Sequence, residues 1–351
     1  MMYNKSKKHI SIIFTGGTIG AYIDKGVMKV YDNPEELLQV LVEKKPEVNT
    51  FAELSIKRAI NILSEDLVPS DWGKIAKIVA REINHNYADG IVITHGTDTL
   101  PFSSAALSFM LKGLTVPVVL TGSNLPLTAE GTDAVQHLYD SILIASKSNL
   151  AGVFVVFKGK DGCSHIHHGT QVRQMQPLED YFESIKNKTL GYVKEEKIYL
   201  SNKDYKKRTQ LTERVRTETA LETNISYFSI FPGFDPKLIH CSVVEGKKAI
   251  LLRLYHSGTA CTRKGKFSII ENVKDATSTG IFVFALSLIS NTKDNTPYPS
   301  VKKFLEMGVI LLKDMSPESA IVKLMWVLGN CKGVEEIRKK MLENIAYEIV
   351  K

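Results

Sequence analysis

One stretch of the sequence decides the fold that we predict: Ile10-Ser11-Ile12-Ile13-Phe14-Thr15-Gly16-Gly17-Thr18-Ile19-Gly20. Its mostly apolar beginning predicts a buried strand, and a hydroxyl residue and a glycine-rich turn follow at once. The same order recurs where Ile91-Val92-Ile93 is followed by Thr94-His95-Gly96-Thr97-Asp98-Thr99. In open α/β sheets, ligands bind beyond the carboxyl ends of the strands. Two such ends with hydroxyl groups and an aspartate therefore predict a candidate nucleophile site.

Strands and helices are expected to alternate over the first half of the chain. The expected strands are 10–14, 91–94, 117–120 and 153–157. The expected helices begin at Asn33-Pro34 and at the cap Ser70, and span 101–112 and 130–146. Helices of about 10–15 residues between short strands are typical of right-handed βαβ units, so this half predicts a mainly parallel sheet flanked by helices.

The segment 201–223 separates this half from a smaller second one. It is charged, has few apolar residues and shows no clear strand, so we interpret it as a linker, with some helix as an alternative. We expect an N-terminal catalytic domain at 1–200 and a C-terminal α/β domain with a parallel sheet at 224–351. The expected strands there are 227–231, 249–255 and 281–286, and the expected helices are 301–307, 317–328 (capped by Ser316) and 334–348.

Composition and charge restrict the class of protein. A chain of 351 residues with 44% hydrophobic residues is long enough for two domains with full cores. The formal net charge is +7, but no zinc finger, RRM signature or basic helix accompanies the basic clusters Lys5–Lys8 and Lys203–Arg208. We interpret these clusters as solvated tail and linker, and expect no nucleic-acid partner.

The apolar runs and the cysteines point to a cytoplasmic protein. The longest apolar stretch, 280–289, is too short to span a bilayer, and no apolar leader precedes the first strand. The four cysteines are widely spaced and form no C-x-x-C pair, so neither a zinc ribbon nor a redox motif is supported. We therefore expect no membrane partner and a reducing compartment.

Thr15 has three interpretations from spacing alone. Its hydroxyl could act as a nucleophile, with freed N–H groups of the glycine-rich turn stabilising an oxyanion. The turn could instead bind a ligand such as a phosphate, or could be a plain turn. A dinucleotide fingerprint would need glycine at positions 15, 17 and 20, and position 15 is threonine; no Walker sequence follows either.

The second hydroxyl-bearing segment is equally open. Asp98 could cap the helix expected before Pro101, or its carboxylate could bind a substrate ammonium. His95 is a general-base candidate by residue type, although a lone histidine before glycine is more often a satisfied structural group. A third polar tip, Ser64-Glu65-Asp66, follows the run 60–63 and carries little information by itself.

One further cluster invites a metal interpretation. His165, His167 and His168 lie close to Asp161 and Cys163. Their spacing has no matching pair elsewhere in the chain, so we interpret the cluster as a polar loop and expect no metal site.

Taken together, the segments resemble the bacterial-type L-asparaginase family, most of all its cytoplasmic type I branch. The resemblance covers nearly the whole chain. The matching segments are 15–20, 64–72, 95–99, 121–127 with Asp133, 231–234, 254–259 and 314–319.

The resemblance implies a two-domain α/β amidohydrolase. Members of this family hydrolyse L-asparagine to aspartate and ammonia without a metal or cofactor, and commonly form intimate dimers that pair into tetramers. It implies a small-molecule amide substrate and a homodimer or homotetramer.

The family's site residues carry over as follows. Thr15 resembles the nucleophile that attacks the side-chain amide carbon, and Thr97 with Asp98 resembles a second hydroxyl relay. The substrate-binding positions implied are Gly16, Ser64, Glu65, Gly96 and Asp98. Ser64 and Asp98 would hold the α-carboxylate and α-ammonium of the substrate, and Glu65 could add a contact to the ammonium.

Three positions depart from the family pattern. The family lysine beside the second threonine aligns with Gln174, the flexible-loop tyrosine with Val27, and an asparagine near Gly258 with Thr259. Tyr22 and Tyr31 lie in the same stretch as Val27 and could replace the tyrosine. The losses would remove acid–base assistance worth about 10²–10⁴-fold.

Two hypotheses follow. In the first, the chain is an amidohydrolase with acyl-enzyme chemistry at Thr15. In the second, it is a catalytically degenerate member that binds an amino acid or peptide as a sensor or partner subunit.

Overall fold

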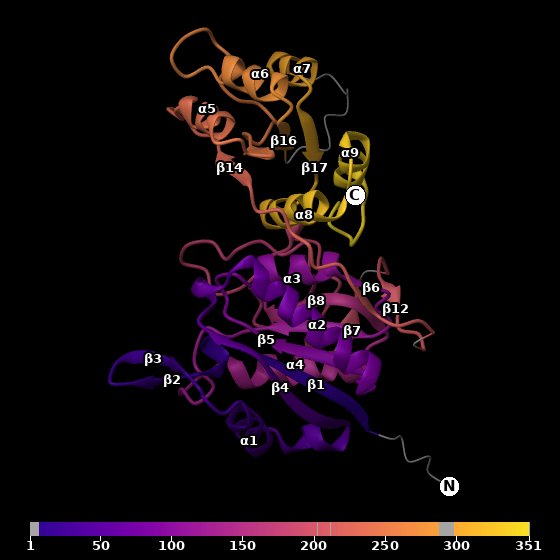
Figure 1. Ribbon diagram of the computed structural model, residues 1–351. Helices are drawn as coiled ribbons and strands as arrows, with labels where there is room; N and C mark the ends of the chain where they lie inside the picture. The colour runs from indigo at the N-terminus through magenta and orange to yellow at the C-terminus, as the bar shows by residue number, and fades with distance from the viewer. Residues whose placement is uncertain (1–6, 202, 211, 288–297, 351) are drawn as a thin grey trace. The chain divides into compact units, whose positions relative to one another are not determined.

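The computed structural model describes residues 7–201, 203–210, 212–287 and 298–350. Lys5 of the basic cluster at the N-terminus, and residues 288–289 of the longest apolar stretch, therefore lie outside the described residues. The chain divides into two compact units, Met1–Thr219 and Ala220–Lys351. Each unit has its own sheet and its own helices (Figure 1).

The first unit is built on a nine-stranded sheet with the main order β11-β10-β9-β8-β7-β5-β1-β4. Its parallel part comprises β1 (Lys8–Gly16), β4 (Ala52–Ile62), β5 (Gly90–Thr94), β7 (Pro117–Thr121) and β8 (Leu150–Lys158). Its antiparallel edge comprises β9 (Ser164–His168), β10 (Gly191–Lys194) and β11 (Lys197–Leu200). β1 lies between β4 and β5 and is buried from Ile10 to Gly16, as its apolar run predicts.

Four helices pack on this sheet: α1 (Glu35–Lys44), α2 (Pro69–His85), α3 (Leu100–Met110) and α4 (Ala134–Lys147). The predicted cap Ser70 is wrong, because Ser70 lies inside the first turn of α2. Pro69 begins the helix, and Asp71 Oδ2 accepts a hydrogen bond from the Val68 N–H at 3.1 Å. This is the reciprocal half of a capping box, with proline at the first helical position.

The crossovers do not all have the predicted right hand. Side chains of α1, of α4 and of one face of β1 share a single core cluster, so α1 and α4 lie on the same face of the sheet. The β1–α1–β4 and β7–α4–β8 connections run in opposite directions along the sheet. Two such crossovers on one face have opposite hands, so one of them is an exception to the usual rule.

The second unit has a four-stranded parallel sheet in the order β14-β15-β16-β17. Its strands are β14 (Ile225–Ser229), β15 (Ala249–Arg253), β16 (Phe282–Ser287) and β17 (Ile310–Lys313). Its helices are α5 (Lys237–Val244), α6 (Ile270–Ser278), α7 (Pro299–Glu306), α8 (Pro317–Asn330) and α9 (Val334–Leu342). Ser316 caps α8 by accepting from the Ser319 N–H at 3.1 Å, as predicted. The predicted fold class is confirmed: a larger, mainly parallel sheet flanked by helices, and a smaller parallel α/β unit.

The segment 201–223 is more ordered than its charge predicts. β12 (Lys206–Lys207) pairs with β8, and β13 (Arg216–Thr217) pairs with β6 (Leu111–Lys112). The expectation of no strand is therefore wrong, and the described part of the segment contains no helix. The backbone groups of β6 and β8 supply the hydrogen-bond partners that a charged segment can use without any apolar side chain.

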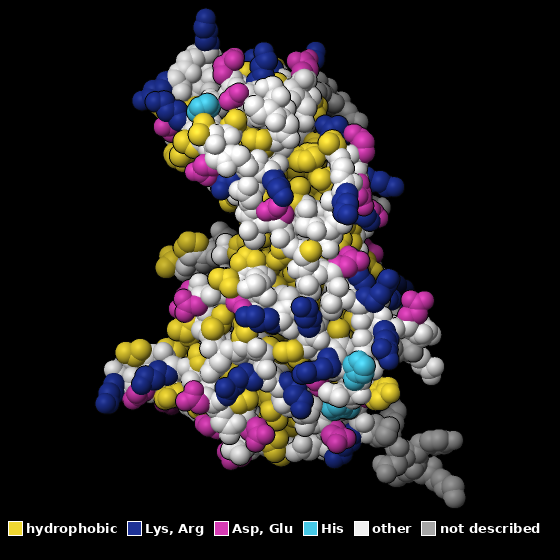
Figure 2. All heavy atoms as spheres, viewed as in Figure 1, with side chains coloured by type: hydrophobic (Ala, Val, Ile, Leu, Met, Phe, Trp, Pro, Cys, Tyr) yellow, Lys and Arg dark blue, Asp and Glu magenta, His cyan; other side chains and the backbone are white. Residues whose placement is uncertain are grey.

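The surface carries mixed charge. Figure 2 shows Lys and Arg side chains interspersed with Asp and Glu on the face in view. Within the residues that the structure describes, no helix combines the length and the apolar character needed to cross a bilayer.

Candidate functional site

Three loop tips meet at the carboxyl end of the central strands. A Cβ added to Gly17 would lie 2.3 Å from the Gly96 nitrogen, and one added to Gly96 would lie 2.4 Å from Ser64 Oγ. Gly17 follows β1, Ser64 follows β4 and Gly96 follows β5, so neighbouring strands bring these residues together. Gly17 also has φ +76°, in the left-handed region. Glycine is therefore required at both positions by close approach.

Thr15 lies at this meeting point. Its Oγ1 donates a hydrogen bond of 2.6 Å to the main-chain oxygen of Thr94 on β5, and the residue is 3% exposed. The hydroxyl proton is thus held by a carbonyl oxygen, which is too weak a base to remove it. A nucleophilic Thr15 needs another group to take that proton.

The N–H groups of the glycine-rich turn are partly occupied. The Gly17 N–H donates to Ile62 O at 3.1 Å, and the Gly20 N–H donates to Gly17 O at 3.0 Å. These two donors hold the short helical turn Thr18–Gly20 in place rather than facing a ligand. The expectation that the turn frees N–H groups for an oxyanion therefore fails for Gly17 and Gly20.

Thr97 and Asp98 follow β5 at the same edge. Thr97 is half-buried, and a Cβ on Gly122, which follows β7, would lie 3.5 Å from Thr97 Cγ2. The Asp98 side chain is exposed. The cap position of α3 is Thr99, whose Oγ1 donates to Ser64 O at 2.9 Å. The interpretation of Asp98 as a helix cap is therefore wrong, and its carboxylate remains open to solvent.

Ser64 and Glu65 share one short helical turn, Ser64–Asp66. Ser64 is 6% exposed and contacts the Gly96 tip, whereas Glu65 is exposed. The polar tip after β4 is thus part of the meeting point, although it carried little information as sequence.

Gln174 also reaches this edge. Its Nε2 donates to the main-chain oxygen of Asp98 at 3.2 Å. The segment after β9 therefore contacts the turn after β5, and it presents an amide where the resemblance implies a lysine. Near neutral pH an amide can neither accept nor hold a proton, and it adds no positive charge.

His95 is a structural group. It is 1% exposed, its Nδ1 contacts the Gly96 carbonyl at 2.8 Å, and its Nε2 has no hydrogen-bond partner among the described residues. Burial lowers the pKa of His95 to about 4. The ring is therefore neutral at physiological pH and too weak a base for a threonine hydroxyl.

The stretch after Thr15 forms a hairpin of β2 (Ala21–Asp24) and β3 (Val27–Val30). Val27 is 61% exposed at its turn, and the rings of Tyr22 and Tyr31 pack with centroids 5.1 Å apart. The Tyr31 N–H donates to Gly20 O at 2.9 Å. Tyr22 lies on β2 and Tyr31 directly follows β3, so both tyrosines that could replace the family tyrosine belong to the stretch joined to the Thr15 turn.

The three histidines of the suspected metal cluster have separate roles. The hydrogen-bond contacts are His165 Nε2 to Asp161 Oδ1 (2.9 Å), His167 Nδ1 to Ser184 Oγ (2.8 Å) and His168 Nε2 to Asp204 O (2.9 Å). They lie on β9, so the expectation of a loop is wrong. The described residues contain no group of three or more His, Cys, Asp or Glu that could hold a metal ion.

Sequence reasoning named Asp133 and the segment 121–127 only as part of the family resemblance, and it missed His137 and the contacts that fix the turn after β7. The Asp133 carboxylate accepts from the main-chain N–H groups of Asn124 and Leu125 at 3.1–3.2 Å. His137 Nδ1 contacts Gly122 O at 3.0 Å, and its Nε2 accepts from the Lys158 N–H at 3.1 Å. The spacing of Asn124 and Asp133 is a signal for such a turn, since an aspartate at a helix start often bonds a preceding loop.

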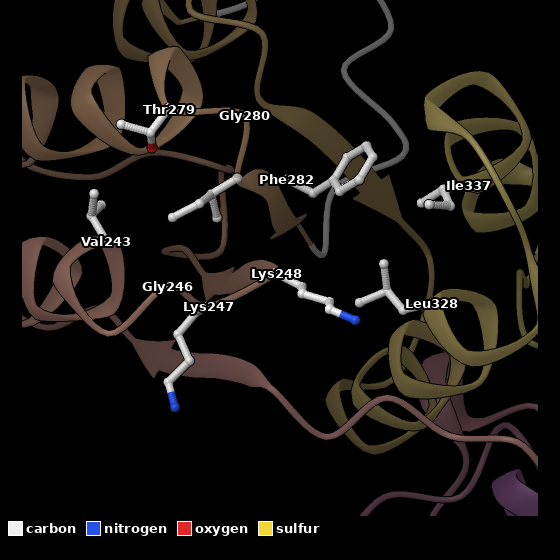
Figure 3. A pocket seen from close by; sticks show the side chains of 10 residues that line it. Val243, Gly246, Lys247, Lys248, Thr279, Gly280, Phe282, Leu328 and Ile337 are labelled. Atoms are coloured by element: carbon white, nitrogen blue, oxygen red, sulfur yellow. The ribbon is translucent and has the colours of Figure 1, made fainter.

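A separate cavity of about 540 Å³ lies in the second unit (Figure 3). Lys247 and Lys248 directly precede β15, and Phe282 begins β16, so the cavity lies at the amino-terminal edge of that sheet. Leu328 and Ile337 line it from α8 and α9. Ligands of open α/β sheets bind at the opposite edge, and none of the predicted site residues lines this cavity.

Comparisons with known proteins agree with the two-unit architecture. Residues 9–206 match the family model for the N-terminal part of asparaginase, and residues 224–341 match that for the glutaminase/asparaginase C-terminal domain. A subunit of the glutamyl-tRNA(Gln) amidotransferase from Pyrococcus abyssi is 36% identical over 345 residues, which cover 97% of this chain and 76% of the relative. Its counterpart from Methanobrevibacter smithii is 33% identical over 350 residues, covering 99% and 78%.

Two solved structures are also similar. The thermostable L-asparaginase from Thermococcus kodakarensis has a TM-score of 0.83 and 30% identity, with 98% of this chain and 99% of the other covered. L-asparaginase I from Vibrio cholerae has a TM-score of 0.84 and 26% identity, with 99% and 100% covered.

Proposed function

The chain belongs to the asparaginase family, and on that premise we propose that it is an amidohydrolase that cleaves the side-chain amide of L-asparagine or a related amide through Thr15. The main support is the meeting of Gly17, Ser64 and Gly96 around the end of β1, where the Thr15 hydroxyl is held in one orientation. Because Thr15 Oγ1 donates its proton to the Thr94 carbonyl, its lone pairs are the part of the hydroxyl that can attack the amide carbon.

The proposed hydrolysis has two steps, formation of an ester on Thr15 and hydrolysis of that ester. Thr15 Oγ1 attacks the amide carbon, the C–N bond breaks, and the hydroxyl proton leaves with nitrogen as ammonia. Water then attacks the resulting ester, which releases the carboxylic acid and restores the Thr15 hydroxyl. Each step needs a group that moves a proton, and Thr97 on the adjacent turn is the hydroxyl that would relay it.

Substrate binding uses the exposed and half-buried polar groups at the same edge. The Asp98 carboxylate pairs with the α-ammonium, Glu65 adds negative charge nearby, and Ser64 binds the α-carboxylate. Gly16 and Gly96, where a side chain would meet Ile62 and Ser64, contribute main-chain groups to the substrate site in this proposal. A charged hydrogen bond contributes about 1.5–3 kcal/mol, so Asp98→Asn raises KM for L-asparagine by roughly 10- to 100-fold.

Gln174 limits the rate. Without a lysine ammonium beside Thr97, the relay lacks the group that would lower the pKa of a hydroxyl. A tyrosine hydroxyl, that of Tyr22 on β2 or that of Tyr31 directly after β3, supplies part of the missing proton transfer. We therefore expect slow turnover of free L-asparagine and a preference for an amide whose other contacts compensate.

The test is ammonia release from L-asparagine, L-glutamine and short asparaginyl compounds. Thr15→Ala abolishes turnover and Thr97→Ala lowers it by about 10²–10⁴-fold. Thr50→Ala is the matched control, because Thr50 is exposed just before β4 begins, at the far edge of the sheet. Turnover that survives Thr15→Ala at the wild-type rate would disprove the nucleophile.

The second candidate function is that of a partner subunit without free turnover. The observation that favours it is the similarity to chains named as subunits of an amidotransferase, combined with glutamine at position 174. In that case the chain binds L-aspartate or a peptide at the same site and releases no ammonia alone. Titration calorimetry measures the binding of L-aspartate to the wild type and to Asp98→Asn. Binding by the wild type that weakens in Asp98→Asn supports this candidate, whereas no binding by either protein indicates that the site is not formed.

The assembly and location belong to the same proposal. We expect a homodimer or homotetramer, as the family resemblance implies, and light scattering coupled to gel filtration measures it. The four cysteines are free in the structure, which suits the reducing cytoplasm that the sequence predicts.

A further inference from the structure

Residues 174–182, here called the 174–182 loop, leave and rejoin the first unit at one narrow base. Val172 and Ser184 form an isolated antiparallel bridge. The Arg173 N–H donates to Glu183 O at 3.0 Å, and the two side chains form an ion pair of 2.6 Å. These contacts close the loop at its base, next to Gln174.

Three contacts join the loop to the sheet. Gln174 Nε2 donates to Asp98 O at 3.2 Å, and Asn124 Nδ2 donates to Asp180 O at 2.7 Å. The Asp180 carboxylate forms an ion pair with Lys158. Asp98 follows β5, Asn124 follows β7 and Lys158 ends β8, and these strands are consecutive in the sheet. The loop therefore lies across three neighbouring carboxyl ends.

The anchors on the sheet side are themselves fixed. Asn124 Nδ2 also donates to Asp133 Oδ2 at 2.9 Å, so the amide bridges two aspartates. The Lys158 N–H donates to His137 Nε2, and His137 Nδ1 contacts Gly122 O. Gly122 packs against the main chain of His95 and against Thr97. The contacts that hold the loop are thus continuous with those that shape the candidate site.

We propose that Lys158, Asn124 and Asp180 form a clasp that holds the 174–182 loop against the Thr97–Asp98 turn, and that Asn124 and Asp180 are positioning residues for substrate binding. The proposal rests on the proposed function. The Lys158 and Asp180 side chains are 27% and 66% exposed, so water reaches the ion pair and the clasp can open. Gln174 leaves Asp98 when it opens, and the turn that holds the substrate ammonium loses a support.

The experiment is a charge swap read by hydrogen exchange and by kinetics. Lys158→Asp and Asp180→Lys each place like charges together, so backbone exchange across the 174–182 loop becomes faster. KM for L-asparagine rises by about two- to fivefold, the range for an exposed ion pair. The double variant brings opposite charges together again and restores both values. Swapping Lys302 and Glu306, an exposed pair on α7, is the matched control that changes neither.

Asn124→Ala separates positioning from general instability. Loss of its two side-chain hydrogen bonds speeds loop exchange and raises KM, whereas simple destabilisation lowers the active fraction and leaves KM unchanged. Single reversals without faster exchange, or a double variant without recovery, overturn the clasp. Faster exchange with an unchanged KM overturns the positioning role. A wild type inactive on every amide refutes the proposed hydrolysis, and the exchange data still decide whether the clasp exists.

Discussion

The side-chain amide of Gln174 donates a hydrogen bond to the main-chain oxygen of Asp98, with an Nε2–O distance of 3.2 Å. A residue after β9 thereby contacts the turn that carries Thr97. The contact needs only a donor of the right length, and a lysine ammonium is also a donor. A lysine at this position would add the charge and the titratable proton that the amide lacks.

Gln174→Lys should therefore raise kcat for L-asparagine. We expect about 10- to 100-fold, part of the 10²–10⁴-fold that a positioned acid–base group contributes. Ammonia-release kinetics measure it. Gln176→Lys is the control, because it places the same charge on the same exposed loop, where Gln176 contacts Gln174 O rather than Asp98. An equal gain in both variants would mean that added charge, rather than its position, is responsible.

The close approach of Gly96 and Ser64 can be tested by stability alone. A Cβ on Gly96 would lie 2.4 Å from Ser64 Oγ and 2.6 Å from Ser64 Cβ, so Gly96→Ala should destabilise the first unit by about 1–3 kcal/mol. Removing both Ser64 atoms in Gly96→Ala with Ser64→Gly should recover most of that loss. Thermal unfolding monitored by circular dichroism measures it. Equal melting temperatures of Gly96→Ala and the double variant would contradict the packing described here.

The strands that position the site could be predicted because burial on both faces makes them continuous apolar runs. The residues 10–14, 91–94 and 117–120 each end within two residues of the strand that the structure shows. β4 escaped prediction because most of its residues are only partly buried, and its sequence has only the short run 60–63 near its end. The short strands of 201–223 were not predicted because they are stabilised by pairing with β8 and β6, and this pairing leaves no apolar pattern in their sequence.

Pairwise contacts in the site were harder to anticipate than its position. The order of motifs brings Thr15, Ser64 and Gly96 to one edge, since parallel neighbours end together. α3 begins at Leu100, so Thr99 rather than Asp98 holds the cap position, and the Thr99 side chain bonds to Ser64 O across loops far apart in sequence. The neutral state of His95 depends on burial, which residue type alone does not reveal.

Buried histidines should make stability depend on pH. Burial lowers the pKa to about 4 for His95, about 3 for His167 and about 4 for His168. In the unfolded chain each titrates near 6.5, so the unfolded state binds more protons between about pH 6.5 and 4. The contribution of these histidines to the free energy of unfolding should therefore be level above about pH 7 and should fall as the pH drops through that window.

His167→Asn tests one contribution to this slope. Asparagine can keep the contact to Ser184 Oγ and cannot titrate, so the slope should decrease by up to about 1.4 kcal/mol per pH unit. Denaturant unfolding at a series of pH values measures it. His85→Asn, an exposed site at the end of α2, should leave the slope as in the wild type. An unchanged slope for His167→Asn would show that this ring is protonated in the folded protein.

A buried ion pair joins Lys323 on α8 to Glu348, which follows α9. Lys323 and Glu348 are both 0% exposed, with Nζ 2.6 Å from Oε1. Lys323 Nζ also donates to Met341 O and Glu343 O, and the Glu348 carboxylate accepts from the N–H groups of Ile345 and Ala346. Every donor of the ammonium has a partner, so removing one member leaves a buried charge without its counterpart.

Lys323→Met should therefore cost about 3–5 kcal/mol, and Lys323→Met with Glu348→Gln should cost less than the sum of the single variants. Burial lowers the pKa of Lys323, and in Glu348→Gln the lone ammonium can shed its proton in the folded state. The loss in Glu348→Gln should thus shrink as the pH rises toward about 10, where the unfolded lysine also titrates. Calorimetric unfolding of the four proteins measures the coupling. Strictly additive losses would show that the two side chains do not interact in solution.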